Sequence, residues 1–482
     1  MSAAAALTKT WTIVSTAPKW LMIGAIAIVV LVIVIIVGSV AKARRHLHRI
    51  KIRRRRASEC SMSDTMTETI FVSVPSYRDP DCAATLLSLF NNARCPHRVF
   101  VGVFSQQRDG GGAADQDILS EYTRLSKLQN CDLFLDNIRF LKVDASEARG
   151  PMFARAVIEK KLYRNEKWYL NIDSHTRFST DWDQHFLDQV ADIARRTLIT
   201  PNRVVVTMYP GDTDNEAPGE CSFEKLPPGS YYRAKKFSDE HGMLQIDGPL
   251  FAKRPPAAIA TMFIGLNCCF SSADRLRLCP FDPRCDYVFL GEETTMAARL
   301  WTHGFDFFNP PCMLVWHRWS RKYRPTFWEN LRDETLFSET VRSERRFRNK
   351  QAMERLWGLL GMHENKYAAK APEPKYGFGA VRSFQAYQHY CGVDWSRQQA
   401  SLECWLGVAG GAGSVATLDA SEAAAKFGNN GSRSSIVAAL RDARDRAGNA
   451  LLAQVDAAAT ATPTTTPTTT STTTPLLVFT KM

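Results

Sequence analysis

Short apolar runs alternate with amphipathic segments in the first part of the chain. Runs with the length of buried strands lie at 69–74, 98–104, 137–144 and 167–173. Asp79 and Pro80 are expected to cap and open a helix after the first run, and Pro151 to open another. Strands that alternate with helices form parallel sheets covered on both faces. The pattern therefore predicts an α/β domain, with ligands at the carboxyl ends of its strands.

A longer apolar run, residues 21–40, has twenty residues and no charge. It is long enough to cross a hydrocarbon core of about 30 Å, so we predict a transmembrane signal-anchor over residues 20–40. Residues 42–56 follow with nine Lys/Arg and no acid. Without those nine, 52 basic residues stand against 49 acidic ones, so the net charge of +12 is a local feature. It does not indicate a nucleic-acid-binding face.

Composition divides the chain into segments. Residues 1–19 form a short tail before the anchor, and residues 41–68 a basic and polar stem. Residues 69–395 are expected to form the catalytic domain. Residues 396–482 are rich in Ala, Gly and Ser and include the Thr/Pro tract 460–475, which cannot bury a core. None of the twelve cysteines forms a CxxC pair, which argues against a zinc ribbon.

The sharpest chemical signal is Asp173-Ser174-His175, directly after an apolar strand. Residues i and i+2 of an extended chain point to one face, so Asp173 and His175 can bind the same ion. A carboxylate and an imidazole suit Mn²⁺ or a similar divalent cation. By itself, a D-x-H triplet is common by chance, and Asp173 can simply cap the strand end.

A second signal is Gly291-Glu292-Glu293, which precedes a segment with helical spacing and Gly304 beyond its end. Carboxylates in a first turn are favoured by the helix dipole alone. The functional alternative is that Glu292 or Glu293 faces an acceptor or a sugar. His317 ends another apolar run and is either a third metal ligand or a packed histidine.

Several polar residues near predicted strand ends are candidates for contacts to a phosphorylated ligand. Guanidinium groups match phosphate oxygens, and the candidates from this chemistry and from strand-end position are Ser76, Tyr77, Arg78, Arg149, Arg155 and Ser174, with Arg318 and Arg321 further along the chain. Arg78 and Arg149 lie at predicted strand-to-helix junctions, where a ligand is expected.

Three long segments together resemble one enzyme family. They are VSVPSYRDPDCAATL, ARGPMFARAVIEKKLYRNEKWYLNIDSHTRF and FLGEETTMAARLWTHGFDFFNPPCMLVWHRWSR, and YGFGAVRSFQAYQHYCGVDW follows them. In this order they resemble the polypeptide α-N-acetylglucosaminyltransferases, which include the Skp1 hydroxyproline GlcNAc-transferase and Golgi enzymes that start mucin-type chains. More distantly, DSH, GEE and WH are similar to motifs of the polypeptide GalNAc-transferases.

The resemblance implies a GT-A fold, Rossmann-like, with Asp173, His175 and His317 as ligands of Mn²⁺ or a similar ion. It implies UDP-GlcNAc as donor, retention of configuration, and a protein acceptor modified on Thr, Ser or hydroxyproline. It also implies a single-pass type II protein of the Golgi membrane with a lumenal catalytic domain. The basic residues after the anchor conflict with this orientation, because positive charge favours the cytoplasmic side.

Two other functions are alternatives to a glycosyltransferase. A metal-dependent hydrolase of nucleotide-sugars needs the same ligands and an activated water. A non-catalytic membrane protein that displays the Thr-rich tail or binds a partner has no need for all three motifs. The Thr/Pro tail is also a possible site of self-modification.

Overall fold

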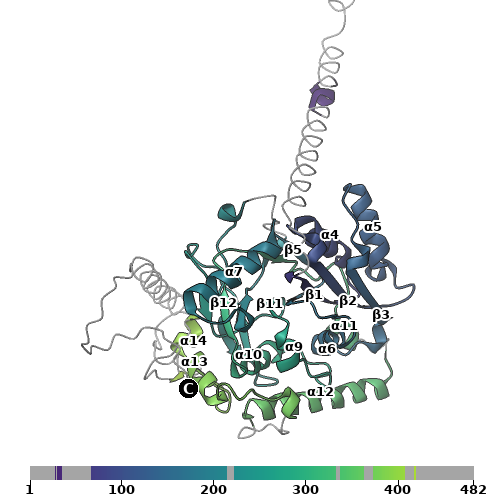
Figure 1. Ribbon diagram of the computed structural model, residues 1–482. Helices are drawn as coiled ribbons and strands as arrows, with labels where there is room; N and C mark the ends of the chain where they lie inside the picture. The colour runs from purple at the N-terminus through teal and green to yellow at the C-terminus, as the bar shows by residue number, and fades with distance from the viewer. Residues whose placement is uncertain are drawn as a thin grey trace, which may run out of the picture.

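The computed structural model describes residues 28, 30–34, 67–213, 222–332, 337–362, 373–407 and 417–418. Its largest sheet has eight strands in the order β10-β12-β6-β11-β4-β1-β2-β3 (Figure 1). The strands of this sheet are β1 (Ile70–Tyr77), β2 (Val99–Gln107), β3 (Ile138–Asp144), β4 (Trp168–Ile172), β6 (Val204–Thr207), β10 (Ile259–Thr261), β11 (Cys268–Ser272) and β12 (Asp306–Asn309).

The sheet is parallel in one half and mixed in the other. β1 pairs in parallel with β2 and β4, and β2 with β3. β11 is antiparallel to both β4 and β6, while β12 is parallel to β6. The mixed α/β architecture with a large parallel sheet confirms the fold class predicted from the alternating pattern. The antiparallel strand β11 was not part of that prediction.

Helices cover both faces of the sheet. They are α4 (Cys82–Asn92), α5 (Ile118–Leu128), α6 (Pro151–Lys161), α7 (Trp182–Thr197), α9 (Asp274–Leu278), α10 (Glu292–Thr302), α11 (Phe327–Arg332), α12 (Glu339–Leu359), α13 (Phe384–Cys391) and α14 (Leu402–Leu406). In Figure 1, α4 and α7 lie above the sheet and α6, α9 and α10 below it. Alternate residues of β1 supply the two cores: Val72 packs on the α4 and α7 side, and Phe71 on the α6 side.

Three smaller sheets complete the described part of the chain. One has the order β5-β13-β7, one β14-β15-β16, and one pairs β8 with β9. Their strands are β5 (Thr176–Phe178), β7 (Gly211–Asp212), β8 (Arg233–Phe237), β9 (Leu244–Asp247), β13 (Val315–His317), β14 (Val393–Asp394), β15 (Gln399–Ser401) and β16 (Thr417–Leu418). The first of these sheets adjoins the carboxyl end of β4 and carries one side of the site described below.

The predicted elements agree with the structure in type and differ at several boundaries: β1 and β2, for example, each end three residues beyond the predicted runs. The four predicted strands correspond to β1, β2, β3 and β4, and Pro151 is the first residue of α6. The first helix, however, begins at Cys82, and Asp79 does not cap it. Asp79 instead turns its buried carboxylate toward His175, so a tertiary contact replaces the expected helix cap.

Most of the predicted transmembrane segment lies outside the described residues. Within it, Ile28 and residues 30–34 are helical and exposed. Among the residues that the structure describes, no helix has both the length and the apolar composition needed to cross a membrane. The stem and the Thr/Pro tract also lie outside the described residues, and the proposed segment boundaries stay predictions.

Candidate functional site

Strand pairing brings two distant histidines together at the end of β4. Asp173 follows β4 directly, and the chain turns through Ser174 and His175 into β5. β5 pairs antiparallel with β13, which places His317 opposite Thr176. A backbone hydrogen bond from Arg318 to the carbonyl of His175 continues this register. The site is therefore built by a pairing between residues more than a hundred positions apart, which the local sequence pattern does not encode.

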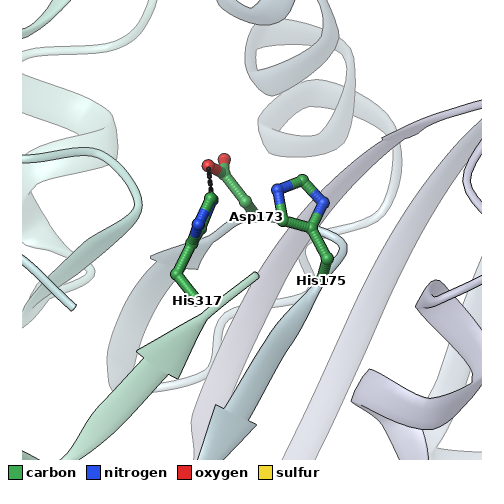
Figure 2. A group of neighbouring side chains, drawn as sticks. All are labelled: Asp173, His175 and His317. Carbon is green, nitrogen blue, oxygen red and sulfur yellow. Dashed lines mark hydrogen bonds and ion pairs between the residues drawn. The ribbon is translucent and has the colours of Figure 1, made fainter. Parts of the chain in front are cut away.

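Asp173, His175 and His317 point toward one another (Figure 2). Each offers a ligand atom, and these atoms lie within 4.8 Å of one another. His317 Nε2 lies 3.1 Å from Asp173 Oδ2, and the two imidazole rings are 4.3 Å apart between centroids. Neighbouring ligands of one ion with bonds of about 2.1 Å lie about 3 Å apart. The three side chains thus have the chemistry and nearly the spacing of a divalent cation site.

The pKa values of Asp173 and His317 are both shifted toward the forms that bind a cation. Burial opposes ionisation of Asp173, but the hydrogen bond with His317 and the nearby positive charges outweigh it. The pKa of the Asp173 carboxyl therefore lies well below its usual range. Burial lowers the pKa of His317. A carboxylate and a neutral imidazole are the protonation states that bind metal ions.

The carboxylate of Asp79 orients the imidazole ring of His175. Its buried Oδ2 lies 2.7 Å from His175 Nδ1 and accepts a hydrogen bond of 2.6 Å from the Ser174 hydroxyl. Tyr323 donates to the other carboxylate oxygen at 3.1 Å. A bond at Nδ1 leaves Nε2 of His175 for a cation, and carboxylates in this position orient metal-binding histidines in many proteins.

Arg155 joins the metal cluster to the first glutamate of α10. Its Nη2 lies 3.1 Å from Asp173 Oδ1, and its Nη1 lies 2.5 Å from Glu292 Oε1. Both Arg155 and Glu292 have side chains that are only 4% exposed. This burial means that the two groups neutralise each other and fix the position of Asp173, instead of facing a ligand.

Glu293 has a different environment from Glu292. It is partly exposed, and burial together with the negative charge of Glu292 raises its pKa to about 8. It lies within electrostatic reach of Tyr209, whose ring stacks on Trp319 at 4.6 Å. Trp319 in turn packs against the ring of His317 at 4.1 Å. Tyr209, Trp319 and His317 thus form an aromatic stack beside the metal cluster, and the charge of Glu293 acts on Tyr209 in that stack.

A pocket of about 130 Å³ opens in front of the cluster. Its lining comes from the carboxyl ends of β1 and β2, from Gly150 and Pro151 at the start of α6, and from residues 173–175 and 321–328. The N-terminus of α6 presents the positive end of its helix dipole, which favours an anion. Arg321 and Arg324 also line this pocket. The arrangement suits a phosphorylated ligand beside a cation.

The candidate ligand-contact residues are distributed unevenly around this pocket. Tyr77 and Ser174 line it. Ser76 is fully buried in β1. Arg78 has a positive φ of 46° and pairs with Asp115 at 2.7 Å.

Two other candidate arginines have partners elsewhere. Arg149 packs over Phe153 at 4.7 Å and lies 3.9 Å from Asp286. Arg155 lies behind the metal cluster. Neither of these two arginines nor Arg78 lines the pocket, whereas Arg321 and Arg324 do, and they are therefore better placed for a phosphate.

Sequence reasoning missed the functional position of Asp79 and of Arg324. Arg324 is 3.4 Å from Asp79 and also donates to the Tyr77 carbonyl. The signal for Arg324 was its place soon after the WHRWSR segment, in a stretch dense in arginine. Its contacts with β1 span some 247 residues of sequence, and only the folded chain shows them.

Comparisons with solved structures give distant similarities. GalNAc-T7 with UDP, GalNAc and Mn²⁺ matches at 13% identity and a TM-score of 0.39, over 63% of this chain. The chain spans 53% of the length of that GalNAc-T7 chain. Mannosyltransferase PcManGT from Pyrobaculum calidifontis, with GDP-Man and Mn²⁺, matches at 14% identity and a TM-score of 0.34, over 87% of this chain and 96% of that one.

A third similar structure is S. aureus TarS 1–349 in complex with UDP-GlcNAc, at 12% identity and a TM-score of 0.30. The match covers 60% of this chain and 72% of that one. No curated protein matches the sequence.

A family comparison by sequence is more decisive. The family described as Glycosyltransferase (GlcNAc) matches residues 69–130 and 113–397. The matched region contains β1 to β4, the three cation-binding candidates, and the Gly291-Glu292-Glu293 segment. It covers more than half of the chain. The chain therefore belongs to the Glycosyltransferase (GlcNAc) family.

Proposed function

We propose that this chain is a metal-dependent retaining glycosyltransferase of GT-A fold that moves GlcNAc from UDP-GlcNAc to a hydroxyl group of a protein. The acceptor hydroxyl belongs to Thr, Ser or hydroxyproline, and the implied subfamily is that of the polypeptide α-N-acetylglucosaminyltransferases. The observation that carries the proposal is the cluster of Asp173, His175 and His317 beside a pocket with an anion-binding helix end, inside the region that matches the family.

The donor diphosphate would lie between the cation ligands and the start of α6. A bound divalent cation supplies charge neutralisation for the departing diphosphate. Arg321 and Arg324 bind the phosphate oxygens from the opposite wall of the pocket. Tyr77 lies at the nucleoside end, because strand ends of this sheet half receive nucleotides in open α/β folds.

The pocket of about 130 Å³ is smaller than the roughly 300–1,000 Å³ of typical ligand sites. Part of the donor must therefore extend beyond this pocket.

Two features of the site support a reaction that retains the anomeric configuration and uses no general base from the protein. Glu292 is engaged by Arg155 and is not available as a base. Glu293 holds its proton up to a pH of about 8 because its pKa is raised, so near neutrality it donates a hydrogen bond to a sugar or acceptor hydroxyl. In a front-face reaction the leaving phosphate oxygen takes the proton of the acceptor hydroxyl as the new glycosidic bond forms.

The test of this proposal is transfer by the purified full-length chain. The assay contains Mn²⁺, one of a panel of labelled UDP-sugars, and either a Thr/Pro-rich peptide or a hydroxyproline peptide, each in a neutral and an acidic version, with and without a chelator. Chelator-sensitive transfer of GlcNAc to one peptide supports donor, metal and acceptor class together. Release of UDP with no labelled peptide in any of these reactions contradicts the transferase proposal and favours a nucleotide-sugar hydrolase.

Membrane placement is a separate part of the proposal. We place the chain in the Golgi membrane as a single-pass type II protein with a lumenal catalytic domain. The nine basic residues of 42–56 favour the opposite orientation. Protease treatment of sealed microsomes decides between them: a protected catalytic domain supports the lumenal orientation, and a digested one rejects it.

A further inference from the structure

A second and larger cavity of about 640 Å³ lies next to the metal pocket. Its walls come from the turn at Glu240 and His241, from the segment 287–290, from α11, and from one side of α12. In Figure 1, α12 runs along the lower edge of the molecule. The volume falls within the roughly 300–1,000 Å³ of binding pockets for small ligands or for parts of larger ones. We call this cavity the α12 groove.

Two aromatic residues connect the α12 groove with the metal pocket. Phe289 and Trp328 line both cavities. Their rings are in edge-to-face contact at 5.7 Å, and Phe289 is 46% exposed. A large exposed aromatic side chain at the junction of two cavities offers a platform to whatever passes between them. A molecule that lies in the α12 groove can therefore reach the metal pocket past these rings.

The position of the groove separates it from the nucleotide side of the site. The metal pocket receives residues from β1, β2 and the start of α6. None of the residues that line the α12 groove, by contrast, belongs to β1, β2 or α6. If the donor nucleotide lies against the strand ends, as proposed above, the groove lies on the side of the sugar that faces the acceptor. This assignment rests on the proposed function.

The charge of α12 indicates the chemistry of the occupant. The helix carries six Lys/Arg against three Glu. Arg342, Arg345 and Arg346 line the groove on successive turns, and Arg342 and Arg346 share one partner, Glu339. Two guanidinium groups on one carboxylate leave a positive excess, and with Glu240 counted the groove is lined by three Arg against two Glu.

On the metal side of the junction, Arg321 lies 5.9 Å from the Phe289 ring. The groove and its entrance are therefore basic and aromatic. Such a lining attracts a chain with negative side chains and adds apolar contact for its backbone and neighbours.

We propose that the α12 groove binds the polypeptide acceptor and selects acceptor segments with Asp or Glu near the modified hydroxyl. The acidic residues lie along α12, while the hydroxyl reaches past Phe289 and Trp328 to the metal pocket. The Thr/Pro tract 460–475 contains no charged residue. It is therefore a poor occupant of this groove, and the preferred acceptor is another, acidic segment.

The test uses fluorescein-labelled Thr peptides, or hydroxyproline peptides, in matched pairs. One member has Asp/Glu around the hydroxyl residue, and the other has Asn/Gln at the same positions. Binding to the full-length chain is measured by anisotropy with UDP and Mn²⁺ present. We expect the acidic peptide to bind about tenfold more tightly at low salt, and the difference to shrink at high salt, where charges are screened.

The variant Arg346→Glu probes the groove directly, because this side chain is 63% exposed and lies on the groove wall. It is expected to weaken binding of the acidic peptide about five- to tenfold, and that of the Asn/Gln peptide much less. Arg195→Glu on α7 is the matched control: its side chain is 77% exposed and, like that of Arg346, pairs with an acid on its own helix. The control is expected to bind both peptides as the wild-type chain does.

Equal binding of acidic and neutral peptides, or equal effects of Arg346→Glu and Arg195→Glu, would overturn the groove assignment. A failure of the proposed function has a different signature. In that case no UDP-sugar is transferred to any peptide, although the acidic peptide still binds and still responds to Arg346→Glu.

Discussion

Replacing Asp79 with asparagine tests how the site orients its metal ligands. The buried carboxylate lies 2.7 Å from His175 Nδ1 and 2.6 Å from the Ser174 hydroxyl, with Tyr323 on its other oxygen. Asparagine has nearly the same shape but no charge, and one of its two terminal atoms is a donor. It cannot accept from all three partners, so His175 loses its fixed ring orientation.

The expected cost follows from these contacts. Loss of a carboxylate that orients a metal-binding histidine typically weakens metal binding by about 10–100-fold, or about 1.4–2.7 kcal/mol. Arg324, whose side chain is 11% exposed and 3.4 Å from Asp79, also loses a negative partner, which costs on the order of 1–3 kcal/mol of unfolding free energy. We therefore expect weak Mn²⁺ binding in a protein that still folds.

The assay is a Mn²⁺ titration of transfer activity, or of UDP release, together with urea denaturation. Asp79→Asn should need about 10–100-fold more Mn²⁺ for half-maximal rate and should recover most of its rate at saturation. Asp81→Asn is the control, because Asp81 pairs with Arg177 at 2.6 Å and contacts no cation-binding candidate. If both variants show the same Mn²⁺ dependence, Asp79 does not position His175 for a cation.

Two further variants examine the buried charges. Arg155→Met should lower the unfolding free energy by about 3–5 kcal/mol in urea denaturation, because Glu292 then remains buried without its partner. Adding Glu292→Gln to this variant should recover part of the lost stability. A loss below about 1 kcal/mol in Arg155→Met would contradict this role of the ion pair. Glu293→Gln tests the raised pKa of about 8. The unfolded carboxyl releases its proton near 4.5 and the folded one near 8, so stability of the wild-type chain falls as pH rises between these values. The variant lacks this contribution and gains stability over wild type on going from pH 5 to pH 8.5, by an amount on the order of a few kcal/mol; equal slopes for both proteins would refute the assignment.

Local patterns predicted the elements that depend on short-range sequence. The strands β1 to β4 and the start of α6 at Pro151 follow from apolar runs and proline position. The place of Asp173 at a strand end follows from the same pattern. By contrast, the antiparallel strand β11 lies between β4 and β6 through a long connection, and no local signal marks its direction.

The site residues show the same contrast between features that local sequence predicts and features that long-range packing decides. His175 was predicted from its spacing to Asp173, but its support by Asp79 joins residues 96 positions apart. Arg78 occupies a junction where a ligand was expected, yet Asp115 engages its guanidinium. Glu292 and Glu293 are adjacent in sequence, and only the folded chain distinguishes the buried, ion-paired Glu292 from the partly exposed Glu293. Long-range packing decides these roles, and a single sequence does not display it.

The most direct test of the cation site is a Mn²⁺ binding measurement by electron paramagnetic resonance on the full-length chain and on Asp173→Ala. The site predicts one tightly bound Mn²⁺ per wild-type chain, lost in Asp173→Ala together with transfer activity, while circular dichroism shows an unchanged fold. Asp81→Asn should retain the ion. Wild-type Mn²⁺ affinity or full activity in Asp173→Ala would contradict the assignment of Asp173, His175 and His317 as the cation site.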